Sequence, residues 1–276
     1  MIAVFVTVYV MALGLGGVVL VALFGLGSGR EQRPLCSART FVAALVSVAA
    51  VLAATAVGEL AVKDKPLDWG LKHARPFQQA LIGFIAGGGI LSVSVIAGWL
   101  VEHEKISSTL STLPSAFGSV LLLSVNFLLV AVGEEMLFRG FVLRQLQRGL
   151  GAWAAIAISG GLFGVFHLAT PDASRVSTAV ISLSGVLFAV LVVRTGSLWC
   201  SMGLHAGWNW FEGFVWGQPV SGKLTGVTML KSDVYGDSIW TGGRYGPEAS
   251  IPIAIVLIAA IVLVVAWRRP HLPRGA

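Results

Sequence analysis

Charged residues are scarce in this chain: only 12% of its 276 residues are Asp, Glu, Lys or Arg. A soluble globular domain carries about 25% charged residues, so the composition argues against a soluble protein. Hydrophobic residues make up 56% of the sequence, and the mean hydropathy is +0.85. Low charge together with long apolar runs predicts a polytopic membrane protein.

Cysteine is also rare, since Cys36 and Cys200 are the only two. They provide neither a disulfide framework nor the paired spacing of a cysteine metal site. The sequence lacks a basic patch interleaved with aromatic residues, which argues against a nucleic-acid partner. Its net charge of +6 lies mostly in short loops and the C-terminal tail, a pattern that favours contact with the lipid bilayer.

Apolar runs of about 20 residues, the length that crosses a bilayer core, recur along the whole chain. We therefore predict an all-α bundle of about eight transmembrane helices in a single transmembrane domain, residues 1–276. The first run has no basic residues before it, so we expect a retained helix. The candidate spans are residues 2–26, 39–62, 79–101, 117–138, 151–170, 176–193, 198–216 and 250–267.

The connections between these spans are short, except for residues 218–249. This loop is rich in glycine and serine and carries Lys223, Lys231, Asp233, Asp237 and Glu248. Loops of this length are usually functional or disordered. The many glycines suggest tight turns, so we expect the loop to be partly ordered.

The stretch G-E-E-M-L-F-R-G, residues 133–140, places three charges at the end of an apolar span. On a helix, Glu135 and Arg139 are four residues apart and can pair on one face. Glu134 is turned about 100° away from Glu135 and stays free. A helix end that emerges into water would explain the same charges, and the basic segment that follows supports this alternative.

Two further polar positions interrupt apolar spans. His167 ends the fifth span, where a single histidine is more often interfacial than catalytic. His205 and Asn209 lie four residues apart in the seventh span and share one helix face. Hydrogen bonding between helices is the alternative for this pair, and the small residues Gly203 and Gly207 also fit close helix packing.

Taken together, a carboxylate, two imidazoles and an amide from three helices are the components of a hydrolytic site. Intramembrane ionisable residues are costly and usually functional. Glu134 and His167 can accept the protons of a water molecule. His205 and Asn209 can donate hydrogen bonds to the oxyanion that forms when this water attacks a peptide carbonyl.

Three motifs occur in order: E-E-x-x-x-R at Glu134–Arg139, F-x-x-x-H at Phe163–His167 and H-x-x-x-N at His205–Asn209. This set resembles the CPBP family of intramembrane proteases, which comprises CAAX prenyl endopeptidases, bacteriocin-processing enzymes and abortive-infection proteins. The resemblance covers residues 117–217, the expected catalytic core. Segments V-W-G-Q-P-V-S-G and T-G-G-R-Y-G-P-E of the long loop also look like bacterial members.

The resemblance implies an intramembrane endopeptidase with a catalytic cavity in the bundle. Glu134 and His167 would activate water, and His205 and Asn209 would form the oxyanion hole. Glu135 and Arg139 would support the site by orienting their helix. The expected partners are a membrane-associated or C-terminal segment of a protein or peptide substrate, and the lipid bilayer of a bacterial cytoplasmic membrane.

Metal dependence is the open alternative in this reading. Glu134, His167 and His205 would make a ligand set for Zn²⁺, with water as the fourth ligand. The chain lacks H-E-x-x-H, and Asn209 is a poor zinc ligand, so we favour glutamate-activated water without metal. A non-catalytic immunity or scaffold protein of the same fold is the alternative function. A proton-coupled transporter is disfavoured because the sequence shows no inverted repeat.

Overall fold

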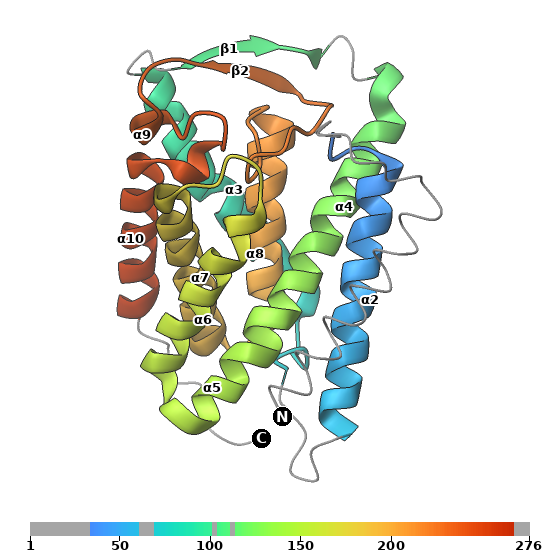
Figure 1. The fold of residues 1–276 in the computed structure, drawn as a ribbon, viewed down its shortest axis with the longest axis vertical. Coiled ribbons are helices and arrows are strands. Elements are labelled where there is room, and N and C mark those ends of the chain that lie inside the picture. Colours follow the sequence, from blue (N-terminus) through green and yellow to red (C-terminus); the bar gives the residue numbers. More distant parts are fainter. Residues whose placement is uncertain (1–33, 61–68, 101–103, 111–113, 268–276) are drawn as a thin grey trace.

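A computed structural model shows an all-α membrane protein built from roughly parallel helices (Figure 1). The structure describes residues 34–60, 69–100, 104–110 and 114–267. The predicted span at residues 2–26 lies outside this part of the chain. Each of the other predicted spans coincides with a helix. The long helices are α2 (Ala38–Leu60), α3 (Pro76–Leu100), α4 (Phe117–Glu135), α6 (Ala152–Phe166), α7 (Arg175–Thr195), α8 (Leu198–Trp210) and α10 (Ile251–Ala266).

Four helical segments in the described part are long and apolar enough to cross a membrane: Pro76–Leu100, Phe117–Leu150, Ala152–Ala169 and Arg175–Thr195. Helices α2 and α10 contribute shorter apolar segments. Large hydrophobic side chains such as Phe77, Ile85 and Leu263 are exposed on the outer faces. Exposed apolar area on this scale suits contact with lipid, which agrees with the prediction from hydropathy.

Helices α4 and α8 both pass into π-helix at their C-terminal ends. The first π-helical segment is η3 (Met136–Val142), which leads into α5 (Leu143–Leu150); the second is η5 (Phe211–Val215). π-Helical turns are rare and often mark functional sites. Here they directly follow the two helices that bear Glu134, Glu135, His205 and Asn209.

Helix α8 occupies the middle of the bundle and packs closely on α3. Glycines on both helices face the partner's backbone: a Cβ at Gly87 would lie 2.0 Å from the Leu204 carbonyl oxygen. In the other direction, a Cβ at Gly203 would lie 2.0 Å from the Ala80 carbonyl oxygen. Close packing by small residues was an alternative explanation for Gly203 in the sequence, and this packing is present.

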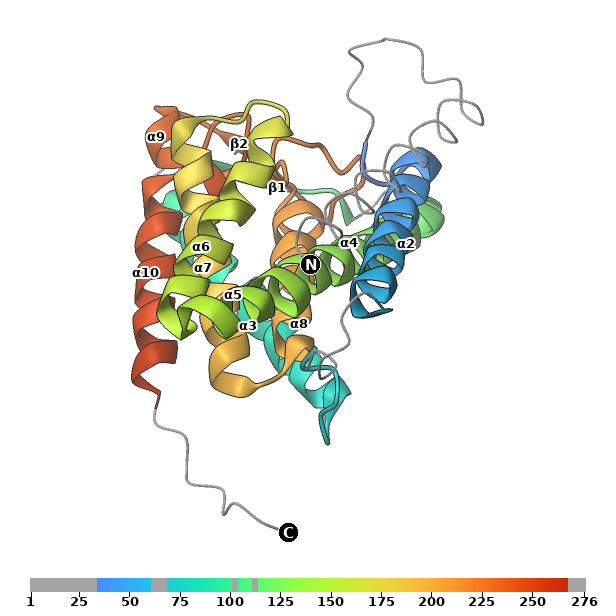
Figure 2. The same ribbon diagram turned by 60° about the horizontal axis from the view of Figure 1, so that its bottom comes forward.

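The remaining helices surround this central pair (Figures 1 and 2). Helices α6, α7 and α10 gather on one side, α2 lies on the other, and α4 crosses between them and contacts both α2 and α8. The buried core includes Leu91, Leu187, Leu198 and Ile253. Helix α7 begins with a capping box between Ser174 and Ser177 and ends at Gly196 in the left-handed conformation.

The long loop is ordered, as the glycine content suggested. It contains strand β2 (Leu230–Val234), a single helical turn α9 (Ser238–Thr241) and the 3₁₀ turn η6 (Pro247–Ala249). Strand β2 pairs antiparallel with β1 (Glu104–Ser108), with Glu104 opposite Val234. This two-stranded sheet, which was not predicted, lies across the end of the bundle where α4 begins, after the 3₁₀ turn η2 (Pro114–Ala116) (Figure 1).

Candidate active site

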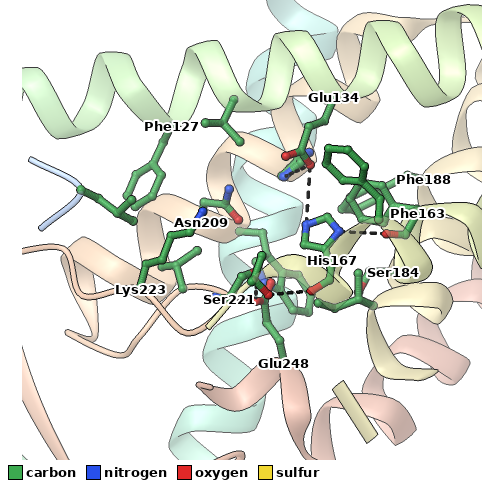
Figure 3. A pocket seen from close by; sticks show the side chains of 18 of the residues that line it. Phe127, Glu134, Phe163, His167, Ser184, Phe188, Asn209, Ser221, Lys223 and Glu248 are labelled. Carbon is green, nitrogen blue, oxygen red and sulfur yellow. Dashed lines mark hydrogen bonds and ion pairs between the residues drawn. The ribbon is translucent and has the colours of Figure 1, made fainter. Parts of the chain in front are cut away.

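Three helices bring the candidate residues to one cavity. Glu134 lies in the last turn of α4, and His205 and Asn209 lie in consecutive turns of α8. His167 begins the 3₁₀ turn η4 (His167–Ala169) that follows α6. All four side chains line a cavity of about 130 Å³, and Figure 3 shows Glu134 directed toward His167. The three motifs, separated by up to 75 residues in sequence, therefore form a single site.

The carboxylate of Glu134 faces both histidines without touching either. Its Oε2 lies 3.8 Å from Nε2 of His167 and 3.9 Å from Nε2 of His205. These distances exceed the usual range of a direct hydrogen bond. The oxygen is buried and has no hydrogen-bond partner among the described residues. A water molecule between the carboxylate and the imidazoles would satisfy these groups.

A backbone carbonyl fixes the tautomer of the His167 ring. Its Nδ1 lies 2.8 Å from the carbonyl oxygen of Phe163, one turn earlier in α6. A carbonyl oxygen only accepts hydrogen bonds, so Nδ1 carries the proton. In the neutral ring, Nε2 then presents a lone pair toward Glu134. His167 is thereby prepared to accept a proton from a bound water.

His205 is oriented in the same way, but by a carboxylate. Its Nδ1 lies 3.1 Å from Oε1 of Glu135, so this nitrogen donates and Nε2 points toward Glu134. Donation from Nε2 to an oxyanion requires a second proton on the ring. The adjacent Glu135 carboxylate is the group that would stabilise such an imidazolium.

Glu135 and Arg139 form the fully buried ion pair that the i, i+4 spacing predicted. Arg139 Nη1 lies 2.9 Å from Glu135 Oε1, and both side chains are inaccessible to solvent. Ser201 donates to the other oxygen of Glu135, and Arg139 Nη2 donates to the Gly185 carbonyl at 3.1 Å. These bonds connect the end of α4 with α7 and α8. The charges are therefore not a helix end emerging into water.

Aromatic rings complete the surroundings of this ion pair. The guanidinium carbon of Arg139 lies 4.3 Å from the ring centroid of Phe163 and 4.9 Å from that of Phe188. Cation–π contacts of this kind are strongest where water is excluded. The Phe188 ring also stacks on His205, with 5.3 Å between centroids. The same rings thus hold the supporting arginine and the candidate catalytic histidine.

Asn209 occupies the next turn of α8 beyond His205 and lines the same cavity. The side chain is buried, and no hydrogen bond from its amide to another described residue is present. The amide group is therefore available to a ligand. Its position, one turn from His205 on the same helix face, suits a second donor to an oxyanion.

Sequence reasoning missed the wall that the long loop contributes. Val220, Ser221, Lys223 and Glu248 all line the cavity. Glu248 Oε2 accepts two hydrogen bonds from Ser221, from the backbone N at 2.9 Å and from Oγ at 2.7 Å. The two loop segments that looked like bacterial family members thus pack on each other, beside the candidate active site.

Asn126 on α4 is a second residue that the sequence analysis did not single out. It precedes Glu134 by eight residues, lines the same cavity and is 2% exposed. At 100° per residue, position i+8 is offset by about 80° from position i, and Val130 at i+4 lies between them, so the two residues border one wide face of α4. That spacing is the signal that could have identified it.

The cavity meets only some of the requirements of a zinc site. Glu134, His167 and His205 offer the right donor atoms, and both histidines have their Nδ1 engaged, as zinc ligands usually do. Their separations of 3.8 and 3.9 Å exceed the roughly 3.3 Å between neighbouring ligands of tetrahedral zinc. In the part of the chain that the structure describes, no group of three or more His, Cys, Asp or Glu side chains fits a metal ion. This geometry does not fit, so no step below passes through a metal.

Part of this chain is similar in sequence to known proteins. Residues 116–211 match the family described as "Type II CAAX prenyl endopeptidase Rce1-like". The matched segment contains all six candidate residues of the three motifs. A curated protein of Bacillus subtilis (strain 168), "Uncharacterized protein YyaK", is 33% identical over 150 residues, which cover 50% of this chain and 46% of that protein. The chain thus matches about half the length of this relative.

Proposed function

We propose that this chain, whose residues 116–211 match the family described as "Type II CAAX prenyl endopeptidase Rce1-like", is an intramembrane endopeptidase. It would hydrolyse peptide bonds in a membrane-associated or C-terminal segment of a protein or peptide. The observation that carries the proposal is the convergence of Glu134, His167 and His205 around one point in a buried cavity.

The reaction begins with a water molecule between Glu134 and His167. The carboxylate and the Nε2 lone pair of His167 both accept hydrogen bonds from it, and together they remove one proton as its oxygen attacks the substrate carbonyl. A new C–O bond forms, and the carbonyl electrons move onto the oxygen to give an oxyanion. No covalent enzyme intermediate is needed.

The oxyanion is stabilised from α8. The Asn209 amide donates one hydrogen bond, and protonated His205 donates another from Nε2, while its Nδ1 stays bonded to Glu135. When the intermediate collapses, the C–N bond breaks. The proton taken from water passes to the leaving amine, which restores the carboxylate of Glu134 and the neutral ring of His167.

Glu135 and Arg139 support this chemistry without contacting the substrate. Their buried pair fixes the end of α4, and Glu135 also orients the His205 ring. This arrangement assigns different tasks to the two adjacent glutamates. Glu134 faces the cavity, whereas Glu135 is covered by Arg139, Ser201 and His205.

For the cellular setting, we propose a multi-pass protein of a bacterial cytoplasmic membrane. The apolar helices support a location in the bilayer. The proposed partners are the lipid bilayer and the peptide substrate, and no nucleic acid. The proposed mechanism uses no metal, so treatment of the active protein with a metal chelator should leave cleavage unchanged, and loss of cleavage would favour the Zn²⁺ alternative.

A comparison of protein termini in membranes of the native host tests the proposal. Membranes with wild-type protein are compared with membranes containing Glu134→Gln, which keeps the side-chain size and removes the base. Glu104→Gln, outside the cavity on β1, is the matched control. We expect defined cleavage products to disappear in Glu134→Gln and to persist in the control.

Identical termini in wild type and Glu134→Gln, with both proteins present at equal levels, would contradict catalysis. A non-catalytic immunity or scaffold protein of the same fold would then be the better explanation. Its partners would be sought by cross-linking in the same membranes.

A further inference from the structure

Asn126 and Glu134 each place an unsatisfied oxygen on the same side of α4. In the described part of the chain, Oδ1 of Asn126 and Oε2 of Glu134 are buried without a hydrogen-bond partner. Both residues line the cavity, and Val130 lies between them on the same helix face. A buried unpaired acceptor costs free energy, so its presence calls for an explanation. For Glu134 that explanation is the hydrolytic water.

The orientation of the Asn126 amide follows from the hydrogen bond that its nitrogen donates. Nδ2 donates to the Leu35 carbonyl oxygen at 3.2 Å. If the amide were flipped, two carbonyl oxygens would face each other, which is unfavourable. The unsatisfied oxygen is therefore fixed on the side away from Leu35.

Leu35 is itself held in place by the long loop. Its backbone N donates to the Leu224 carbonyl at 2.9 Å, and Cys36 N donates to the Thr225 carbonyl at 3.0 Å. The carbonyl that orients Asn126 is consequently part of an ordered strand-like contact. An acceptor positioned by such a network is preorganised for a ligand.

We propose that Asn126 is a substrate-positioning residue whose Oδ1 accepts a hydrogen bond from a backbone N–H of the peptide substrate. The proposal rests on the proposed protease function and adds to it a second point of attachment, away from the scissile bond. The ligand must supply a donor, because Oδ1 only accepts. A backbone amide is the donor that every peptide carries.

The helix geometry fixes where on the substrate this contact falls. Eight residues of α-helix span about 12 Å along the axis. An extended peptide advances about 3.3–3.6 Å per residue. The N–H bound by Asn126 therefore belongs to a residue about three or four positions from the bond that Glu134 attacks.

The residues that line the cavity lie along the path that such a peptide would take, from Glu134 toward Asn126. Figure 3 shows Phe127 and Lys223 on the side of Asn209 away from His167. Leu35 and Val220 also line the cavity. A peptide that extends from the catalytic residues along α4 would pass these side chains. A proline at the contacting position lacks an N–H and would be disfavoured.

The test uses the full-length protein in detergent and a set of quenched fluorescent decapeptides. The peptide that the wild type cleaves fastest is remade with one backbone amide at a time replaced by an ester. An ester removes the N–H and keeps the chain geometry. Wild-type protein should lose about fivefold in kcat/KM at one position, three or four residues from the cleavage site, as expected for one hydrogen bond.

Asn126→Leu has a similar size and no acceptor. It should cleave the all-amide peptide about fivefold more slowly in kcat/KM, chiefly through KM, and show no further loss with the ester at that position. Asn126→Ala also lacks the acceptor, so it replaces Asn126→Leu if that variant does not fold and should likewise show no further loss with the ester. Leu128→Ala, on the exposed face of α4, is the control and should behave like wild type.

An unchanged ester penalty in folded Asn126→Leu, or no sensitive position in the wild type, would overturn the subsite. In that case Oδ1 would serve a buried water instead. These results differ from failure of the protease function itself. If wild type and Glu134→Gln cleave the peptides equally, or neither cleaves any, both proposals fall together.

Discussion

His205 Nδ1 and Arg139 Nη1 donate to the same oxygen, Oε1 of Glu135, at 3.1 and 2.9 Å. The shared carboxylate links the candidate oxyanion donor to the buried cation that fixes α4. Any change to the ion pair is therefore transmitted to the His205 ring. The buried ion pair and the proposed oxyanion donor therefore share one oxygen atom.

Replacing Arg139 with alanine should reduce stability and activity together. The change leaves Glu135 buried without its cation, removes the bond to the Gly185 carbonyl and empties the space between Phe163 and Phe188. Breaking a buried pair by removing one partner costs about 3–5 kcal/mol. A thermal melt in detergent, with peptide cleavage measured on the same sample, would show both losses.

Arg75→Ala is the control, because Arg75 is exposed in the segment before α3. It should melt like the wild type. A melting temperature for Arg139→Ala equal to that of Arg75→Ala would mean that the pair contributes nothing to the fold. The structural role assigned to Arg139 would then be wrong.

The contact between α3 and α8 provides a second prediction from two neighbouring glycines. A Cβ at Gly87 would lie 2.0 Å from the Leu204 carbonyl oxygen, whereas a Cβ at Gly89 would meet nothing within 4 Å. Alanine is favoured over glycine in a helix interior by about 1 kcal/mol. Gly89→Ala should therefore be neutral or slightly stabilising, while Gly87→Ala forces the helices apart.

The separation of α3 from α8 would displace His205, the neighbour of Leu204 in α8. We thus expect Gly87→Ala to lower both the melting temperature and the rate of peptide cleavage. Both variants replace glycine with alanine in α3, so the difference between their melting temperatures does not contain the effect of helix propensity. Equal stability of the two variants would refute the close-packing argument.

Much of this architecture follows from patterns that are local in the sequence. Hydropathy identified the helices, since lipid exposure requires long apolar segments. The i, i+4 spacing predicted the Glu135–Arg139 pair, because a helix brings those positions together wherever it lies in the fold. The order of the three motifs indicated which helices carry the candidate site.

The structural features that the sequence did not predict depend on contacts between distant segments. Strand β1 has only five residues, and its partner β2 lies more than 120 residues later, so neither has a local pairing signal. The bonds from Ser221 to Glu248 likewise join the two ends of the long loop. Burial of Asn126 beside Leu35 depends on the same tertiary packing.

Glu248 should control the order of the turn that forms one wall of the cavity. Ser221 has a φ of +47°, a conformation that costs a residue with a side chain about 1–3 kcal/mol. The carboxylate of Glu248 offsets this cost with its two hydrogen bonds to Ser221. Glu248→Ala should therefore increase hydrogen exchange at the amides of Val220 and Lys223, which bond to each other's carbonyls.

Asp237→Ala is the matched control, because Asp237 is a carboxylate of the same loop that caps α9 and does not line the cavity. It should leave exchange at Val220 and Lys223 unchanged. Unaltered protection of those amides in Glu248→Ala would show that the turn is ordered by other contacts.

Glu104, outside the membrane-spanning helices, should make stability depend on pH. Burial raises the pKa of Glu104 from 4.5 to about 7, although a hydrogen bond from Gln218 Nε2 at 2.8 Å partly opposes this. The folded state therefore binds this proton more tightly than the unfolded state. The resulting stabilisation is complete below pH 4.5 and is lost as the pH rises through about 7.

Melting temperatures in detergent, measured between about pH 5 and pH 8.5, test this expectation, because the linkage acts in that window. Glu104→Gln removes the titrating group and should lose less stability than the wild type as the pH rises. Asp233→Asn, on the paired strand and half-exposed, should retain the wild-type dependence. If Glu104→Gln and the wild type lose stability equally, burial of the Glu104 carboxylate is not the source of the effect.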